Sequence, residues 1–411
     1  MHSGTAKRSF ASWILAMLLL LTLPAVVQGQ DYLYTTNNNT ITIKRYKGAG
    51  GAVSIPDSVY GYPVTSIGNW AFLGCISLTS VTIPDSVTSI ADWAFFECPN
   101  LTSVAIGNGV TNIGYVAFQS CTSLTNAIFG NSLTSIGNSA FWNCFSLRSV
   151  TIPDSVTIIE DYAFGKCTNL NNVMLGKGIA EIGELAFAIC RSLTSIAIPS
   201  SVTNIGNSAF WSCRSLVNIT IADGVPSIGY AAFAECTSLT NVTIPKSVTN
   251  IGGGAFGLCT SLSSITVAAS VTDIGDMAFS YCPKLTAVYF MGNAPSLGGR
   301  DVFENDYNAT VYYLPGTSGW GPTFGGRPTA LWFLPNPVIL NNGPSFGVQT
   351  NQFGFIISWA TIVPVTVEAC TNLSNPRWSA LQAVTLTNGS AYFCDFDWTN
   401  HPRRFYRLRW P

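Results

Sequence analysis

The chain has 411 residues, of which 47% are hydrophobic and 9% are charged, and its formal net charge is −1. Nucleic-acid binding relies on clustered lysine and arginine side chains, so this composition argues against DNA or RNA as a partner. The one local group of basic residues is Arg403, Arg404, Arg407 and Arg409, which we interpret as the solvated face of a terminal strand.

Residues 1–29 have the pattern of a secretory signal peptide. Lys7 and Arg8 precede an apolar run from Trp13 to Val27, and the small residue Gly29 follows at an expected cleavage site. The run is shorter than an ordinary membrane span. We therefore expect a secreted or cell-surface protein without a transmembrane span in its mature chain, which carries 17 basic and 20 acidic residues.

Residues 30–63 are expected to cap the N-terminal end of a repeat array. Residues 40–46 alternate in the manner of a strand, and a glycine-rich turn follows them at residues 48–51. The segment Ile55 to Val59 already resembles the repeat that begins after it. An open array would otherwise expose its core at this end.

Residues 64–291 contain a repeat of 23 residues, which indicates a stack of identical structural units. A leucine, an isoleucine and an Ala-Phe pair recur at fixed places beside a cysteine in every copy. The consensus is L-T-S-V-T-I-P-D-S-V-T-S-I-G-x-x-A-F-x-x-C-x-S. The ten cysteines are Cys75, Cys98, Cys121, Cys144, Cys167, Cys190, Cys213, Cys236, Cys259 and Cys282.

Each copy predicts a short strand, a corner and one helical turn. Leu78, Val81 and Ile83 alternate with polar residues, as in a strand with one buried face. The column of Asn and Asp residues that begins at Asn69 is expected to provide the N-cap of a helical turn formed by Ala-Phe-x-x-Cys. The fold class that follows is a repeat solenoid of parallel β-strands plus short helical turns, with about ten rungs.

The cysteine ladder is expected to consist of free, buried thiols, although secretion normally favours disulfides. Equivalent residues on neighbouring rungs point in parallel and stay about 4.8 Å apart. This separation lies outside the usual range of about 3.5 to 4.5 Å between bridged β-carbons.

Residues 292–335 are expected to close the stack, because the repeat decays there, and residues 336–411 are expected to form a small β-sandwich. Short alternating runs separated by turn signals such as Asn342-Gly343 and Asn388-Gly389 are typical of that fold. A disulfide between Cys370 and Cys394 is one expectation for this domain, and two free thiols are the other.

The residues available for catalysis favour a protein that is not an enzyme. His2 and His401 are its only histidines, and His2 belongs to the predicted signal peptide. The pairs Asp85/Asp154 and Asp92/Asp161 each lie three rungs apart, about 14 Å, which is too far for a catalytic carboxylate pair. The spacing of His, Cys and acidic residues predicts no metal site and no cofactor.

Two surfaces are candidates for binding a partner. The strand face carries small hydroxyl residues such as Thr79 and Thr102, which equally serve to stabilise an exposed sheet. The helical-turn side carries aromatic residues in two columns, which form an outward stripe for sugars or proteins or, alternatively, pack between adjacent turns. These are Trp70, Trp93 and Tyr162 in one column and Phe96, Trp142 and Trp211 in the other.

The repeat resembles that of BspA-like leucine-rich-repeat surface proteins of bacteria, in which L-x-x-V-x-I-P and I-G-x-x-A-F-x-x-C alternate. The resemblance covers Val64 to about Phe290 and implies a secreted or cell-surface solenoid used for adhesion and protein binding, with no shared catalytic residue. We therefore expect a non-enzymatic binding protein whose partner is an extracellular protein or matrix macromolecule. The alternative is a carbohydrate-binding or carbohydrate-active secreted protein.

Overall fold

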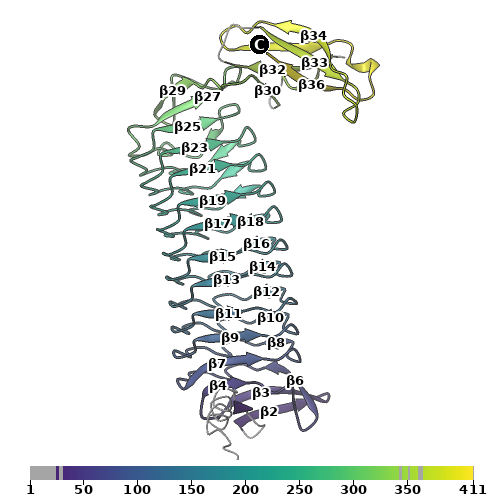
Figure 1. Cartoon of the computed structure of the whole chain (residues 1–411). Helices are drawn as coiled ribbons and strands as arrows, with labels where there is room; N and C mark the ends of the chain where they lie inside the picture. Colours follow the sequence, from purple (N-terminus) through teal and green to yellow (C-terminus); the bar gives the residue numbers. More distant parts are fainter. Residues whose placement is uncertain (1–24, 27–30, 342–344, 350–351, 360–363, 411) are drawn as a thin grey trace, which may run out of the picture.

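The computed structural model describes residues 25–26, 31–341, 345–349, 352–359 and 364–410. A long stack of parallel strands is followed by a small antiparallel domain (Figure 1). The predicted signal peptide lies outside the described residues except for Ala25–Val26, which form the short strand β1 beside β4. Among the described residues, no helix has the length and hydropathy of a membrane-spanning segment.

The first wall of the stack contains the strand that opens each repeat. Its strands form three successive sheets, β1 to β15, β17 with β19, and β21 to β29, in which neighbours pair in parallel except for β28, which pairs antiparallel with β29. They are β1, β4 (Gly51–Ser54), β7 (Leu78–Ile83), β9 (Ser103–Ile106), β11 (Asn126–Ile128), β13 (Ser149–Thr151), β15 (Asn172–Met174), β17 (Ser195–Ile198), β19 (Asn218–Ile221), β21 (Asn241–Ile244), β23 (Ser264–Val267), β25 (Ala287–Phe290), β27 (Thr310–Tyr313), β28 (Thr323–Phe324) and β29 (Arg327–Leu331).

The second wall is one sheet of short strands that end at the repeated isoleucine. It begins with the antiparallel hairpin β2–β3, where the N-terminal cap was predicted. Its strands are β2 (Tyr32–Asn37), β3 (Thr40–Tyr46), β5 (Ser58–Val59), β6 (Tyr62–Ile67), β8 (Ser89–Ile90), β10 (Asn112–Ile113), β12 (Ser135–Ile136), β14 (Ile158–Ile159), β16 (Glu181–Ile182), β18 (Asn204–Ile205), β20 (Ser227–Ile228), β22 (Asn250–Ile251), β24 (Asp273–Ile274) and β26 (Ser296–Leu297).

The register of both walls equals the period of the sequence, which confirms the predicted solenoid. Ile196 lies opposite Ile219 in the first wall, and Ile113 lies opposite Ile136 in the second, each 23 residues apart. Identical side chains therefore stack along the axis, and each rung forms backbone hydrogen bonds with the rungs on either side.

The third side of each rung is a series of tight turns, not the predicted helical turn. We call this side the turn wall; it comprises Gly68 to Cys75 and the equivalent segments every 23 residues up to Gly275 to Cys282. Trp70 and Gly74 have φ values of +58° and +63°, which a right-handed helix does not allow. The amide of Phe72 donates to the carbonyl of Ala94 on the next rung at 2.7 Å. A helix would keep such bonds within itself, whereas the turns use them to join rungs.

The predicted N-cap residues also join rungs. Asp92 accepts a hydrogen bond from the backbone N–H of Tyr115, at 2.8 Å, and Asp161 accepts one from Glu184, at 2.7 Å. Asp85 does the same for the amide of Asn108, at 2.6 Å. The carboxylates are structural, as predicted, but each satisfies an amide on the following rung in place of one in its own turn.

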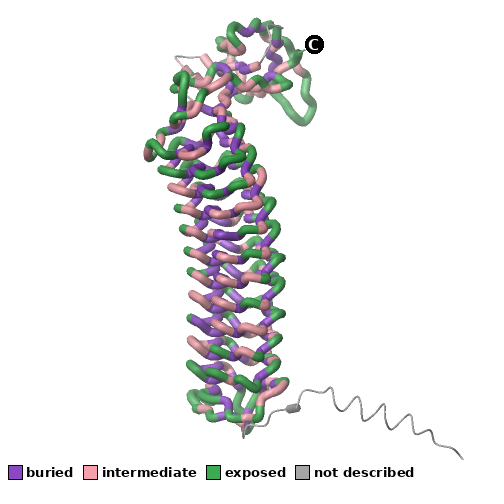
Figure 2. Tube along the Cα trace, turned by 90° about the vertical axis from the view of Figure 1, so that its left-hand side faces the viewer, coloured by how far each residue is buried: buried purple, intermediate pink, exposed green. Residues whose placement is uncertain are grey.

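The core is a continuous stack of phenylalanine rings along the axis, and Figure 2 shows buried residues running through the interior of the stack. Consecutive rings from Phe72 to Phe279 have centroids 4.6 to 6.0 Å apart and lie nearly parallel. Tyr46 stacks on Phe72 at one end, and Phe303 extends the stack beyond Phe279 at the other. Since aromatic rings bury large areas, this column is the centre of the hydrophobic core.

The cysteine ladder consists of free thiols beside the ring stack. Each Sγ from Cys98 onward donates to the carbonyl of the phenylalanine on the preceding rung, as Cys98 does to Phe72 at 3.0 Å. Burial raises the pKa of Cys167, Cys213 and Cys259 to about 12. The thiols are therefore protonated, and a protonated thiol is a poor nucleophile.

The C-terminal domain contains two small antiparallel sheets around its own core, as predicted for the end of the chain. One sheet comprises β30 (Val338–Leu340), β31 (Gly347–Gln349), β32 (Gln352–Ser358) and β35 (Ser390–Asp395). The other comprises β33 (Val365–Cys370), β34 (Ser379–Val384) and β36 (Phe405–Arg409), and a short 3₁₀ helix, η2 (Trp398–Asn400), precedes β36.

Cys370 and Cys394 are free thiols in this structure, so the disulfide considered for them is absent from it. Cys370 ends β33, whereas Cys394 lies in β35 of the other sheet. Phe393 belongs to the core, and neighbouring residues of a strand point to opposite faces. Cys394 therefore points away from the sheet that contains Cys370.

The last rung departs from the repeat at its cysteine position. Val302, Phe303 and Asp306 take the places of Ala, Phe and Cys, and the Asp306 side chain is fully buried. Its Oδ1 accepts from the amide of Cys282 at 2.6 Å, while its Oδ2 has no hydrogen-bond partner among the described residues. Burial raises the pKa of Asp306 to about 7, and the Cys282 amide and the charge of Arg327 oppose the shift.

The free-thiol ladder predicts the outcome of thiol titration. In the native mature protein, the thiols from Cys98 to Cys282 should not react with a disulfide reagent at pH 8, because they are buried. After denaturation without reductant, all ten ladder thiols should react. Two or fewer reactive thiols under those conditions would contradict the free ladder.

Asp306 predicts a pH-dependent stability. The folded state holds a proton that the unfolded chain releases above about pH 4, so the free energy of unfolding should fall as the pH rises from about 4 to 7. Between pH 5 and 8 the loss should be about 2 to 3 kcal/mol. Urea unfolding of the wild type and of Asp306→Asn at both pH values would measure it. Asn keeps an acceptor for Cys282 but does not titrate, so equal pH dependence in the two proteins would refute this role.

Candidate functional site

The turn wall presents the most variable side chains of the solenoid to solvent. Two of its positions vary widely in side-chain size from rung to rung, and we name each column after one member. The Trp70 column contains Trp70, Trp93, Val116, Ser139, Tyr162, Leu185, Ser208, Ala231, Gly254 and Met277. The Phe96 column contains Leu73, Phe96, Gln119, Trp142, Gly165, Ala188, Trp211, Ala234, Gly257 and Ser280. All six aromatic candidates from the sequence lie in these columns.

Three aromatic rings form a cluster at the N-terminal end of the turn wall. Trp70 stacks on Trp93 with centroids 5.6 Å apart, and Trp93 meets the edge of Tyr115 at 5.0 Å. Trp70 is 52% exposed and Tyr115 is 45% exposed, whereas Trp93 and Phe96 are half-buried. These rings pack on one another and are still available to a partner. The outward-surface interpretation and the interpretation as packing between adjacent turns therefore both apply to this cluster.

Trp142 and Tyr162 form a second, more buried cluster. Their rings meet at 5.4 Å, and the Lys166 ammonium lies 5.0 Å from the Trp142 ring centroid. A β-carbon added at Gly165 would overlap the Trp142 ring, so this ring lies over the glycine of the next rung. Trp211 is half-buried in the same column. The six candidate residues therefore form separate groups along the wall, and no unbroken stripe connects them in the described rungs.

An apolar groove lies farther along the turn wall, and sequence reasoning missed it. It has a volume of about 460 Å³. Its lining, which we call the Gly254 groove, comprises Tyr230, Ala231, Ala234, Gly253, Gly254, Gly257, Leu258, Asp276, Met277, Ser280 and Tyr281. The signal in the sequence is the loss of large side chains from both columns in consecutive repeats, which a search for aromatic residues does not detect.

The strand face uses its hydroxyl groups within the structure. Thr102 Oγ1 donates to the carbonyl of Thr79 at 2.8 Å, and Thr125 Oγ1 donates to that of Thr102 at 3.0 Å. The same pattern recurs where the second wall begins, as from Thr134 to Thr111. These side chains link rungs, which supports the structural interpretation of the threonine ladders.

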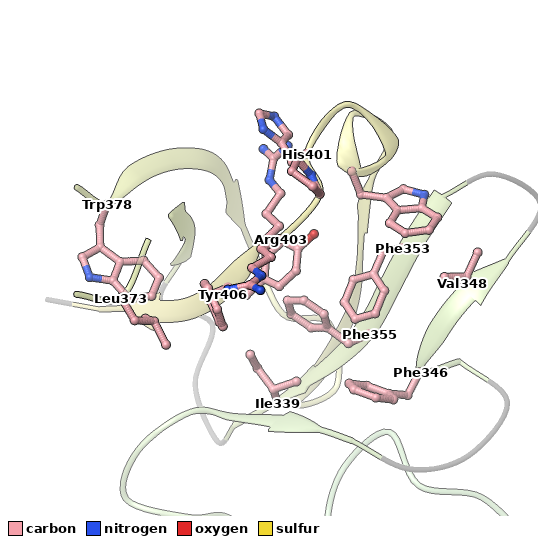
Figure 3. Close-up of a pocket in the computed structure, with 14 residues that line it drawn as sticks. Ile339, Phe346, Val348, Phe353, Phe355, Leu373, Trp378, His401, Arg403 and Tyr406 are labelled. Carbon is pink, nitrogen blue, oxygen red and sulfur yellow. The ribbon is translucent and has the colours of Figure 1, made fainter. Parts of the chain in front are cut away.

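The C-terminal domain contains an aromatic pocket of about 610 Å³ between its two sheets and the loop before β36. Figure 3 shows Phe353, Phe355 and Tyr406 in its centre, Leu373 and Trp378 on one side, Phe346 and Val348 on the other, and His401 and Arg403 above them. We call it the aromatic pocket. The sequence contained these rings, but their grouping depends on strand pairing that periodicity does not specify.

Ion pairs hold the polar edge of this pocket. Arg404, whose side chain is 10% exposed, pairs with Asp395 at 3.0 Å and with Asp397 at 3.3 Å. His401 Nε2 lies 3.1 Å from Asp397 Oδ2. Hydrogen bonds from Asn400, His401 and Arg404 lower the pKa of Asp397.

Arginines before the C-terminus form ion pairs within the domain, whereas the sequence predicted only a solvated face. Arg404 is buried, which corrects its assignment to a solvated face. Arg407 and Arg409 do lie on the terminal strand β36, where both pair with Glu368 of β33 at 2.7 Å. Among the residues that the structure describes, no group of three or more His, Cys, Asp or Glu side chains is arranged to hold a metal ion.

Comparison with known proteins identifies the repeat. Residues 51–171 and 180–310 match the family described as BspA type Leucine rich repeat region, with six copies. No curated protein matches the chain. A leucine-rich repeat protein from Bacteroides ovatus is 27% identical, with 69% of this chain and 83% of that chain covered and a TM-score of 0.57.

Two further solved structures are similar in sequence. A leucine-rich repeat protein of T. pallidum is 30% identical over 52% of this chain and 90% of that chain, with a TM-score of 0.42. A leucine-rich cell surface protein of Faecalibacterium prausnitzii is 27% identical over 66% and 96%, with a TM-score of 0.31. Since the family match covers more than half of its residues, this chain belongs to the BspA-type leucine-rich repeat family.

Proposed function

We propose that the chain is a non-enzymatic binding protein, secreted or held at the cell surface, whose turn wall contacts an extracellular protein or matrix macromolecule in the manner of an adhesin. The observation that carries the proposal is the exposed cluster of Trp70, Trp93 and Tyr115. Exposed tryptophan and tyrosine side chains supply most of the affinity at many protein interfaces.

The other surfaces support this assignment. The strand-face hydroxyls and the aspartates of the corners form hydrogen bonds between rungs, so their chemistry serves the scaffold. The positive run and apolar stretch within residues 1–29 favour export, and the related protein of Faecalibacterium prausnitzii is described as a cell surface protein.

A carbohydrate-binding role is the second candidate, and the aromatic pocket favours it. Sugar rings stack on aromatic faces, and Trp378 with Phe353 and Tyr406 offers several of them beside the polar side chains of His401 and Arg403. In this case the ligand would bind to the C-terminal domain, and the solenoid would act as a spacer.

The first proposal predicts separate effects of two tryptophan pairs. Replacing Trp70 and Trp93 together by Ala should weaken binding to a panel of immobilised matrix proteins at least ten-fold, because both rings lie in an exposed cluster. Replacing Trp142 and Trp211 by Ala should instead lower the free energy of unfolding, by about 2 to 4 kcal/mol, because these rings are more buried. Surface plasmon resonance and urea unfolding measure the two effects. Lost stability with unchanged binding in both variants would refute these aromatic clusters of the turn wall as the contact surface.

The second candidate predicts glycan binding through the aromatic pocket. On a glycan array, the mature protein should bind a sugar class that Trp378→Ala no longer binds, since Trp378 provides a face at the pocket edge. Phe396→Ala is the matched control, because Phe396 is exposed in the same domain but does not line the pocket. A parallel hydrolysis assay should show no turnover, and measurable turnover would contradict the non-enzymatic assignment.

A further inference from the structure

The Gly254 groove is a gap in an otherwise filled surface. In the Trp70 column the side chain shrinks to Ala231 and then to Gly254, and in the Phe96 column it shrinks to Ala234 and then to Gly257. Larger residues border the gap, namely Tyr230, Leu258, Met277 and Tyr281, and each of these is exposed. Small residues in two adjacent columns on two adjacent rungs therefore make the groove.

The backbone does not require glycine on the floor of the groove. Gly254 has a φ of +61°, but Trp93 and Tyr162 in the same column adopt +53° and +60° with large side chains. A β-carbon added at Gly254 would have no atom within 4 Å, and the nearest atom to one at Gly257 would be 3.3 Å away. The space above Gly254 is therefore open, whereas a side chain at Gly257 would contact the Gly254 carbonyl and Ser280 Oγ.

Elsewhere on the turn wall, a ring fills the equivalent space. The Trp142 ring occupies the space over Gly165, which is one rung farther in the same column. The Tyr230 ring contacts the space above Gly253 less closely, because it lies 3.4 Å from an added β-carbon whose nearest atom is the Asp276 carbonyl oxygen. Gly257 is equivalent to Gly165, four repeats later, but the residue in the place of Trp142 is Ala234. The groove therefore corresponds to the space that Trp142 occupies over Gly165, but no ring of this chain fills it.

We propose that the Gly254 groove binds an aromatic side chain, above all tryptophan, presented by a segment of a partner protein. The guest ring would lie over Gly257 and Gly254 as Trp142 lies over Gly165, with Tyr230 and Tyr281 on either side. This inference rests on the proposed function, because it names the chemistry of the protein partner that the turn wall would recognise.

The surroundings of the groove favour an aromatic side chain over a sugar. Leu258 takes the place of Lys166, and Gly254 takes the place of Tyr162. The Gly254 groove is therefore wider and more apolar than the space that Trp142 fills. Its polar side chains are those of Asp276 and Ser280 and the two tyrosine hydroxyls. A sugar ring needs several hydrogen bonds at once, whereas an indole ring mainly needs apolar contact.

The test uses the full mature chain and N-acetyl-L-tryptophanamide as the probe, with binding followed by saturation-transfer NMR. We expect saturable binding by the wild type with a dissociation constant on the order of a millimolar or tighter. Ala234→Trp should abolish it, because the added indole would occupy the space over Gly257. Thr243→Trp is the matched control, since it adds the same ring to exposed strand β21, and it should leave binding unchanged.

Each other outcome overturns the proposal. These outcomes are no saturable binding to the wild type, equal binding by Ala234→Trp and the wild type, and preferential binding of methyl β-D-glucopyranoside that Ala234→Trp blocks. If circular dichroism shows that Ala234→Trp does not fold, Met277→Glu decides the matter. A charge at that exposed wall should weaken probe binding at least five-fold, and unchanged binding would refute the groove.

The result is independent of the test on Trp70 and Trp93. That test concerns macromolecules and the other end of the turn wall, whereas this one measures a small probe on purified protein. A groove that binds no probe would leave the proposed function standing, and a failed matrix-binding assay would leave the groove site standing.

Discussion

The structure depends on hydrogen bonding between rungs that are held in one register of 23 residues. Strand amides such as that of Thr102 donate back to the preceding rung, whereas turn-wall amides such as that of Phe72 donate forward to the following one. Aspartate side chains add a further set of bonds at the corners. An insertion of one residue within a strand would break several of these series at once, whereas the extra residue before Phe303 lies outside the strands and leaves that ring stacked on Phe279.

This constraint explains which parts of the fold the sequence predicts. Periodicity identifies the repeated columns, and stacking then follows, so the solenoid, the ring stack and the free thiols could be derived from residues such as Phe164 and Cys167. The conformation of the turn wall could not. Ala-Phe-x-x-Cys has the spacing of a helical turn, but bonds to neighbouring rungs compete with bonds inside a helix, and a single repeat contains no information about its neighbours.

The candidate sites show a second limit of sequence reasoning. A search for aromatic residues finds Trp70, Trp93 and Trp142, but the Gly254 groove exists because Ala234 and Gly257 have no large side chain. The groove can be interpreted as space for an aromatic ring only because the structure shows Trp142 lying over Gly165. The aromatic pocket is harder still, because its lining comes from strands and loops whose pairing is not periodic, and Phe353 meets Tyr406 across two sheets.

The three walls use their side chains differently, and this difference explains why we expect recognition on the turn wall. On the two strand walls, outward positions contribute hydroxyl and amide groups to bonds between rungs, so their chemistry is restricted. On the turn wall, backbone hydrogen bonds join the rungs at the Trp70 column itself. This column therefore accepts residues as different as Trp93, Ser208 and Gly254, which have similar left-handed φ values. A scaffold whose cohesion does not depend on these side chains can change them without loss of fold. Under the proposed function, binding specificity would be set by which positions of the turn wall carry a ring and which leave space for a ring of the partner.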